Sequence, residues 1–240
     1  MVTRFPNGAD QTRLARLAVP VVLVISALTA CSSSTPTAAT PAELLAKAKT
    51  TVDAAPSMHF TLTSQDVPSG AGRLTDGEGV IARPSSFQGS LTVGIAGATA
   101  KIDVVSVDGS VYAKLPLAGF TKVDPASFGL NDPAGLVSPT TGVTTLLTQM
   151  TGVESKGQIR IGSEVLEQVH GKIPGALVAS LLASADPATP VDATVAIAPD
   201  SGQLRRAVLV GPFFVAGSTS TFTIVLDRYG EKVSISAPAG

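Results

Sequence analysis

Apolar and polar residues alternate with a period of two along most of this 240-residue chain. Successive side chains of a β-strand point to opposite faces, so this pattern predicts strands with one buried face. Short turn signals such as Asp108-Gly109 separate the segments and favour antiparallel hairpins. We predict about ten strands in two meanders. The first contains 59–63, 79–83, 87–95, 99–107 and 111–115, and the second contains 156–161, 165–173, 191–198, 203–210, 219–227 and 232–236.

Helical signals interrupt the strands at three places. In the first, Thr40 suits the N-cap, Pro41 suits the first helical position, and Glu43 completes a capping box. Prolines then break the strand pattern between residues 116 and 150. These signals predict an α+β fold with helices over 41–55, 141–150 and 175–185 and a short apolar turn over 134–137.

The interior of such a fold must be built almost entirely from aliphatic side chains. Hydrophobic residues make up 44% of the chain, whereas aromatic residues make up 4% and tryptophan is absent. Small branched aliphatic residues fill a flat sheet well, and they also form the wall that a cavity for alkyl chains requires. Composition alone leaves both a solid core and an apolar cavity open.

The N-terminal segment has the pattern of a bacterial lipoprotein signal. Three arginines precede an apolar run over 17–28, which is too short for a membrane-spanning helix. The run ends in Leu28-Thr29-Ala30-Cys31, which contains the only cysteine of the chain. We predict cleavage after Ala30, a diacylglycerol on the Cys31 thiol and an N-acyl chain on its amino group. The alternative is an ordinary secretory signal with an incidental cysteine.

The signal divides the chain into three predicted parts. Residues 1–30 are a cleaved signal peptide, 31–40 a flexible tether of low complexity, and 41–240 a single folded domain. Two or more acyl chains hold a protein durably on a membrane. We therefore expect the domain on the outer face of the cell membrane or in a periplasm-like envelope space, anchored by lipid and partly released.

Charge and motifs exclude several function classes. Removal of residues 1–30 takes away three of 17 Lys and Arg residues and one of 18 Asp and Glu residues, which leaves a net charge of about −3. A nucleic-acid-binding domain is expected to show a basic patch instead. His59 and His170 lie in predicted strands without a second ligand at metal spacing. The chain has neither a Gly-x-Ser-x-Gly elbow nor a phosphate loop. We predict no enzyme activity, no metal and no nucleic-acid partner.

Several motifs resemble those of a known family. The order and spacing of the mycobacterial envelope lipoproteins LppX, LprA, LprF and LprG are matched by Val107-Asp108-Gly109-Ser110-Val111-Tyr112-Ala113, Asp132-Pro133-Ala134, Pro139-Thr140-Thr141-Gly142, residues 157–171 and Tyr229-Gly230-Glu231-Lys232-Val233. The resemblance covers residues 41–238 and the lipoprotein signal. The chain departs from the family in Tyr229, where relatives often have tryptophan, and in the apolar character of residues 203–221.

The resemblance implies a strongly curved antiparallel half-barrel, with helices covering its concave face around an apolar cavity. It also implies binding of acylated glycolipids, such as phosphatidylinositol mannosides and lipoarabinomannan, or of other long-chain lipids such as triacylglycerol. Delivery of these lipids across the envelope and a lipid exporter as partner follow from the same resemblance. We expect a monomer whose ligand is an acylated lipid and which has no cofactor beyond the acyl chains on Cys31.

Candidate cavity residues are aliphatic and come from two neighbouring strands and from the covering helices. Leu91 matches a cavity-wall position of the LprG-like members. The alternative is that these side chains simply pack against one another. The predicted lipid-binding set is Leu91, Val93, Ile95, Ile102, Val104, Leu146, Leu147, Leu177 and Leu181.

Two further pairs carry weaker hypotheses. Arg205-Arg206 is the only adjacent basic pair in the exported domain, and it is a candidate for contacting a phosphate-bearing headgroup at the cavity rim. The alternative is that at least one of the two is an ordinary solvent-facing strand residue. Phe213-Phe214 is a candidate for a membrane-touching tip or a lid, with packing into the domain as the alternative.

The sequence thus favours a lipid carrier, with an envelope scaffold that assists an exporter as the alternative. An enclosed aliphatic void on the order of several hundred Å³ or more would favour the carrier. A fully packed interior would favour the scaffold.

Overall fold

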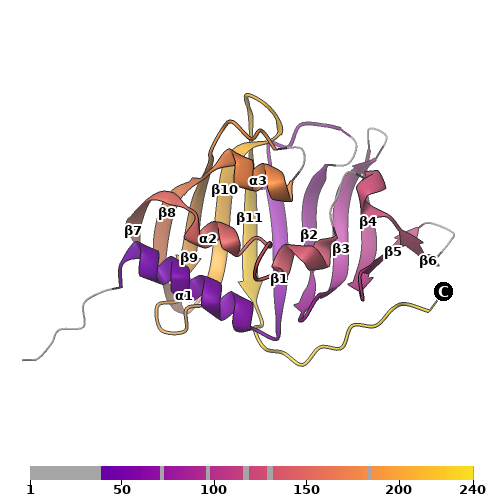
Figure 1. Cartoon of the computed structure of the whole chain (residues 1–240), viewed down its shortest axis with the longest axis horizontal. Helices are drawn as coiled ribbons and strands as arrows, with labels where there is room; N and C mark the ends of the chain where they lie inside the picture. Colours follow the sequence, from indigo (N-terminus) through magenta and orange to yellow (C-terminus); the bar gives the residue numbers. More distant parts are fainter. Residues whose placement is uncertain are drawn as a thin grey trace, which may run out of the picture. The chain divides into compact units, whose positions relative to one another are not determined.

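The computed structural model describes residues 39–70, 73–95, 98–115, 119–128, 132–182 and 185–239. These residues form an antiparallel sheet of eleven strands with helices on one face (Figure 1). The predicted signal peptide and Cys31 lie outside them. The strands are β1 (Ser57–Gln65), β2 (Leu74–Ala82), β3 (Ser86–Ile95), β4 (Ala98–Val107), β5 (Ser110–Leu115), β6 (Gly119–Val123), β7 (Thr151–Ile161), β8 (Glu164–Ile173), β9 (Val191–Ile197), β10 (Leu204–Val215) and β11 (Ser218–Asp227).

The strand order joins the beginning and the end of the domain at the centre of the sheet. The order is β6-β5-β4-β3-β2-β1-β11-β10-β9-β8-β7. Strands β1–β6 form one meander and β7–β11 the other, as the alternation predicts. β1 joins the two by pairing with β11, where Phe60 lies opposite Leu226. The curved antiparallel α+β architecture is therefore confirmed, although β6 was not predicted.

Helix α1 (Pro41–Ala54) follows the predicted boundaries closely. The Glu43 amide donates to Thr40 Oγ1 at 3.3 Å, and the Thr40 amide donates to Glu43 Oε2 at 2.8 Å, which completes the capping box. The Thr40 amide and the Thr40 hydroxyl both donate to the Glu43 carboxylate, and these two hydrogen bonds lower the pKa of that carboxyl. Lys47 ties the helix to the β9–β10 turn by donating to the carbonyl oxygens of Pro199 and Asp200. The buried apolar face consists of Leu44, Leu45, Ala48 and Val52.

The other helices are shorter than predicted. α2 (Thr145–Thr148) begins after the expected residue 141, because the preceding chain forms turns in which the Gly142 amide donates to the Ser138 carbonyl oxygen. α3 (Gly175–Leu181) ends before residue 185 because Leu182 adopts an extended conformation. The predicted apolar turn forms a 3-10 helix, η2 (Pro133–Val137), and a similar helix, η1 (Pro125–Phe128), precedes it.

The predicted strand over 232–236 is wrong. Residues 231–239 have no regular secondary structure. Strand β11 already pairs with β1 and β10, so the chain that follows it meets no free strand edge. The Gly230 amide donates to the Ser57 carbonyl oxygen instead, and the Ser57 hydroxyl donates to the Glu231 carbonyl oxygen.

Candidate functional site

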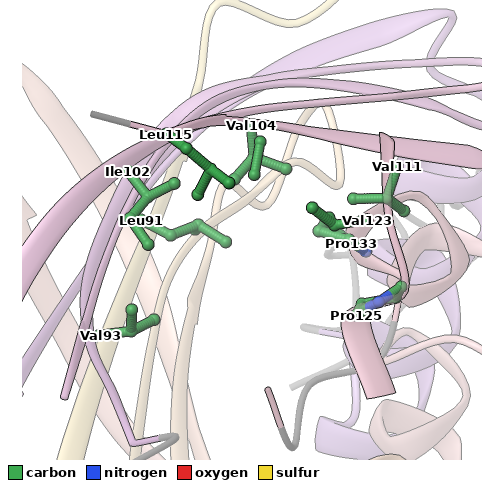
Figure 2. Close-up of a pocket in the computed structure, with 10 residues that line it drawn as sticks. Leu91, Val93, Ile102, Val104, Val111, Leu115, Val123, Pro125 and Pro133 are labelled. Atoms are coloured by element: carbon green, nitrogen blue, oxygen red, sulfur yellow. The ribbon is translucent and has the colours of Figure 1, made fainter. Parts of the chain in front are cut away.

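A small apolar pocket lies between strands β3–β6 and the two 3-10 helices (Figure 2). Its volume is about 50 Å³. In Figure 2, the residues of β3 and β4 lie along the bent strands on one side of the pocket, while Pro125 of η1 and Pro133 of η2 lie on the other, beside Val111 and Val123. Every lining residue in the described part of the chain is aliphatic or proline: Leu91, Val93, Ile102, Val104, Val111, Ala113, Leu115, Val123, Pro125 and Pro133.

The pocket is smaller than the void that the sequence led us to expect. A cavity of about 150 Å³ is known to hold benzene, and this pocket has about 50 Å³. A long acyl chain therefore does not fit the arrangement seen here. The physical reason is that η2 packs directly onto β3 and β4, with Pro133 facing the strand residues.

Four of the predicted cavity residues do line this pocket. Leu91 and Val93 come from β3, and Ile102 and Val104 come from the neighbouring β4, in positions that share one face of each strand. Leu91 is 7% exposed and lies opposite Gly77 of β2, which has no side chain to fill the space. The side chain of Ile95 lies outside the described part of the chain.

The four predicted helix residues do not line the pocket. Leu146 and Leu147 of α2 are buried in the core, and Leu177 and Leu181 of α3 are half-buried against it. In Figure 1, α2 and α3 lie in front of the β9–β11 side of the sheet, whereas every strand residue of the pocket comes from β3–β6. The sequence pattern identified apolar helix faces correctly but could not assign them to one half of the sheet.

Sequence reasoning missed the pocket residues on β5, β6 and the 3-10 helices. Val111, Ala113 and Leu115 alternate in the predicted strand 111–115, so their shared face was a usable signal. Val123 lies in β6, which the neighbouring prolines concealed. Pro133 was identified only as part of the Asp132-Pro133-Ala134 motif.

A hydrogen bond inside the fold fixes η2 over the strands. Ser106 follows Ile102 and Val104 on the same face of β4 and is 0% exposed. Its hydroxyl donates to Asp132 Oδ1 at 2.6 Å. The same carboxyl oxygen accepts from the Ala134 amide at 2.9 Å and so caps η2. The Asp132-Pro133-Ala134 motif therefore starts the 3-10 helix and attaches it beside the pocket.

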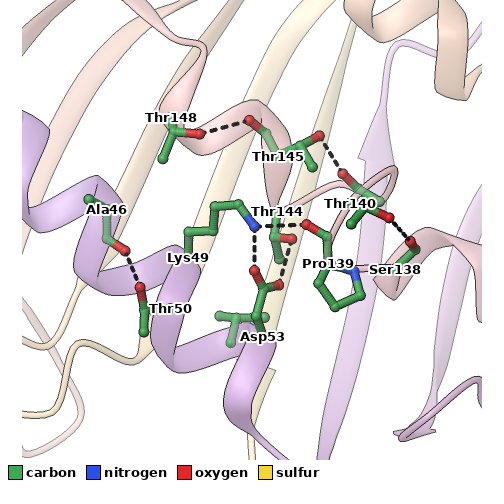
Figure 3. A network of polar contacts seen from close by, with 12 residues as sticks. Ala46, Lys49, Thr50, Asp53, Ser138, Pro139, Thr140, Thr144, Thr145 and Thr148 are labelled. Atoms are coloured by element: carbon green, nitrogen blue, oxygen red, sulfur yellow. Dashed lines mark hydrogen bonds and ion pairs between the residues drawn. The ribbon is translucent and has the colours of Figure 1, made fainter.

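A second polar network holds the chain between η2 and α2 against α1 (Figure 3). Lys49 forms an ion pair with Asp53 and donates to the Pro139 carbonyl oxygen at 2.9 Å. The Thr144 hydroxyl, which belongs to a residue only 3% exposed, donates to Asp53 Oδ1 at 2.8 Å. The Arg83 guanidinium lies 3.7 Å from the same oxygen. Asp53 thus joins α1, the segment before α2 and the β2–β3 turn.

The arginine pair does not lie at the rim of this pocket. Arg205 and Arg206 belong to β10, which contributes no residue to the pocket lining. Arg205 forms an ion pair with Glu164 at 2.6 Å, and its guanidinium lies over the Tyr229 ring. β10 lies in the other half of the sheet, so the pair is not placed to meet a headgroup at this rim, and its contact with a headgroup elsewhere stays a prediction.

The two residues of the phenylalanine pair differ in burial, and Phe213 packs into the domain. Phe213 is 1% exposed and meets Phe222 edge to face, with ring centroids 4.9 Å apart. Phe214 is half-buried, and Arg73 lies over its ring. Both residues lie near the end of β10, in the β10–β11 hairpin. Phe213 is therefore a core residue and not a membrane-touching tip.

No helix in the described part of the chain is both long and apolar enough to cross a membrane. The same residues bring together no group of three or more His, Cys, Asp or Glu side chains that suits a metal ion.

A curved eleven-stranded sheet with an apolar pocket on its helix-covered face agrees with the family indicated by the motifs. Residues 40–235 match the family described as LppX_LprAFG lipoprotein. The chain belongs to this family. Membership in the LppX_LprAFG lipoproteins also confirms that the chain is not an enzyme, and it indicates a membrane-anchored location in the cell envelope.

Sequence relatives of this LppX_LprAFG lipoprotein carry a functional name. The lipoarabinomannan carrier protein LprG of Mycobacterium tuberculosis (strain ATCC 25618 / H37Rv) is 26% identical over 230 residues, which cover 93% of this chain and 95% of LprG. The lipoarabinomannan carrier protein LprG of Mycobacterium leprae (strain TN) is 24% identical over 182 residues, which cover 76% of this chain and 73% of that protein. These comparisons support a lipid-carrier family.

Two solved structures of the family share the fold. LprF from Mycobacterium bovis superposes with a TM-score of 0.69 and 16% sequence identity, covering 83% of this chain and 97% of LprF. The Mycobacterium tuberculosis lipoprotein LppX gives a TM-score of 0.61 at 18% identity, covering 82% of this chain and 98% of LppX. At these identities the likeness establishes the architecture.

Proposed function

We propose that this protein is a membrane-anchored carrier that binds acylated lipids or glycolipids in the apolar pocket and moves them across the cell envelope. The observation that carries the proposal is the pocket lining, which consists of aliphatic residues and prolines. Candidate cargoes are phosphatidylinositol mannosides, lipoarabinomannan and triacylglycerol. The name of the LprG relatives, lipoarabinomannan carrier protein, supports lipoarabinomannan among these.

The physical need for a carrier follows from the cost of exposing hydrocarbon to water. At about 0.8 kcal/mol per CH₂, a 16-carbon chain costs on the order of 12 kcal/mol. The free energy of an acyl chain in a dry aliphatic pocket is close to its free energy in the bilayer. Lipid can therefore enter and leave the pocket without being trapped. Bound lipid would contact Leu91, Val93, Ile102 and Val104, the predicted residues that line the pocket.

The anchor and location belong to the same proposal. We place a diacylglycerol on the Cys31 thiol and an N-acyl chain on its amino group, which would hold the domain on the outer face of the cell membrane. The lipoprotein family supports this anchor. A lipid exporter is the proposed protein partner, and the carrier acts as a monomer.

Lipid analysis of the protein from its own host tests the carrier. The chain is purified with Cys31→Ser, so that no covalent acyl chain is present, and examined by native mass spectrometry. We expect a protein-bound acylated lipid at close to one copy per chain. A spectrum with the bare polypeptide mass as its sole protein signal would contradict the proposal.

One observation favours an envelope scaffold instead. The pocket has a volume of about 50 Å³, which is closer to a packed interior than to an acyl-chain cavity. A scaffold would lack bound lipid. After chemical cross-linking in the host, an envelope protein would be recovered together with it. The carrier predicts lipid in the native mass spectrum whether or not such a protein is found.

A further inference from the structure

The chain between η2 and α2 is attached to the rest of the domain unequally at its two ends. We name residues 132–144 the strap. At the end next to α2, the carbonyl oxygen of Pro139 accepts from Lys49 and the hydroxyl of Thr144 donates to Asp53 (Figure 3). Both partners lie on α1, and the Lys49–Asp53 ion pair joins them to each other.

At the other end of the strap, within the described residues, a single side-chain hydrogen bond connects η2 to the sheet. Ser106 is the polar member of the row Ile102, Val104 and Ser106 on β4. A buried hydroxyl is costly in an apolar surrounding unless it has a partner. Its partner is Asp132 at 2.6 Å, the first residue of the strap. Ser106 thus provides a polar attachment point in an otherwise aliphatic floor.

This attachment lies beside the pocket. Pro133, which follows Asp132 directly, lines the pocket opposite the residues of β3 and β4 (Figure 2). The distance between Pro133 and these strands therefore determines how much room the pocket has. With a volume of about 50 Å³, the closed arrangement is too small for an acyl chain, so η2 has to move away from β4 before a chain can enter.

We propose that the strap is a hinged cover of the pocket, which pivots at its α1-bound end and opens by releasing Asp132 from Ser106. This inference rests on the proposed lipid-binding function, because opening is required only if the pocket accepts a chain. Among the described residues, two links on α1 retain one end, and one link on β4 closes the other. The Ser106–Asp132 hydrogen bond then controls the rate of lipid entry and does not select the lipid headgroup.

A disulfide between positions 106 and 132, which can be formed and then reduced, tests the opening. The full chain carries Cys31→Ser together with Ser106→Cys and Asp132→Cys, and uptake of fluorescently labelled palmitate is measured before and after reduction. We expect the oxidised form to take up the probe at least about tenfold more slowly than the reduced form. A tenfold change in rate corresponds to about 1.4 kcal/mol of activation free energy. Equal uptake by both forms would overturn the strap proposal. If neither form binds the probe, the proposed lipid-binding function fails instead.

A second variant tests the strap without any ligand. Ser106→Ala removes the link, and amide hydrogen exchange is followed at Gly135 and Ser138, whose amides donate within the strap. We expect exchange about tenfold faster at these amides, within the range for a lost hydrogen bond, and unchanged exchange at Gln149 after α2. Ser90→Ala is the matched control, since Ser90 donates to Asp103 at 2.8 Å between the neighbouring strands β3 and β4. Unchanged amide hydrogen exchange in the strap of the Ser106→Ala protein would refute the proposal. This test holds even if the cysteine pair fails to form a disulfide.

Discussion

Gly79 of β2 and Gly89 of β3 lie directly opposite each other, and the Phe87 ring covers the space that their missing side chains leave. A Cβ added to Gly89 would lie 2.2 Å from the Glu78 carbonyl oxygen and 2.7 Å from the Gly79 Cα. The two backbones therefore approach more closely than side chains would allow. This close approach leaves room for the Phe87 ring, which is fully buried.

Gly89→Ala should destabilise the fold by about 3 kcal/mol, because the new methyl group meets backbone atoms that cannot move aside. Urea unfolding measures the loss. Gly135→Ala is the control, since a Cβ at Gly135 in η2 has no atom within 4 Å. A Gly89→Ala protein as stable as the control would show that the β2–β3 pair can separate at no cost.

The glycine pair shows why the sequence predicted the strands better than the bending of the sheet. Alternation revealed that Gly89, Leu91 and Val93 share a face, because a side-chain period of two is a local property. Whether a sheet closes around a cavity depends on which strands become neighbours. The pairing of β1 with β11 joins residues 168 positions apart, such as His59 and Asp227, and no local pattern contains that information.

The candidate site was predictable to the extent that it lies on strands. Leu91, Val93, Ile102 and Val104 follow from alternation together with the family resemblance. The pocket positions of Pro125 and Pro133 could not be predicted in this way. A proline shows that a strand is interrupted, but it does not show what the interrupting segment covers. The leucines of α2 and α3 were assigned to the pocket because an apolar helix face indicates burial without showing which strands it meets.

Thr144→Val should weaken the connection between α1 and the segment before α2. The substitution keeps the shape of a buried side chain but removes the hydroxyl that donates to Asp53. We expect the free energy of unfolding to fall by about 1–2 kcal/mol. Thr148→Val serves as the control because Thr148 is exposed and its hydroxyl donates to the nearby Thr145 carbonyl oxygen. Equal losses in the two variants would argue against a stabilising role for Asp53.

The protein should lose stability at alkaline pH through Tyr229. Its hydroxyl donates to the Leu204 carbonyl oxygen at 2.6 Å, and burial raises the pKa of the phenol well above its ordinary value. Above about pH 10 the unfolded chain releases this proton while the folded chain keeps it, so stability falls as pH rises. Urea midpoints between about pH 9 and pH 11 should decline less steeply in Tyr229→Phe. Lys101, whose pKa is raised by its hydrogen bond to Glu78, contributes equally to both proteins. Parallel declines would exclude Tyr229 as the source.

Leu91→Trp should abolish lipid retention while leaving the rest of the domain folded. Leu91 lines the pocket and its side chain approaches the empty side of Gly77, so an indole ring at this position occupies the space that an acyl chain needs. Val225→Trp is the control, because Val225 is 37% exposed on β11 and lines no part of the pocket. Mass spectrometry of co-purified lipid should show a loss of about tenfold or more for Leu91→Trp, which corresponds to about 1.4 kcal/mol of binding free energy, and no loss for the control. Equal lipid in Leu91→Trp and the parent protein would mean that the bound chain lies elsewhere on the sheet.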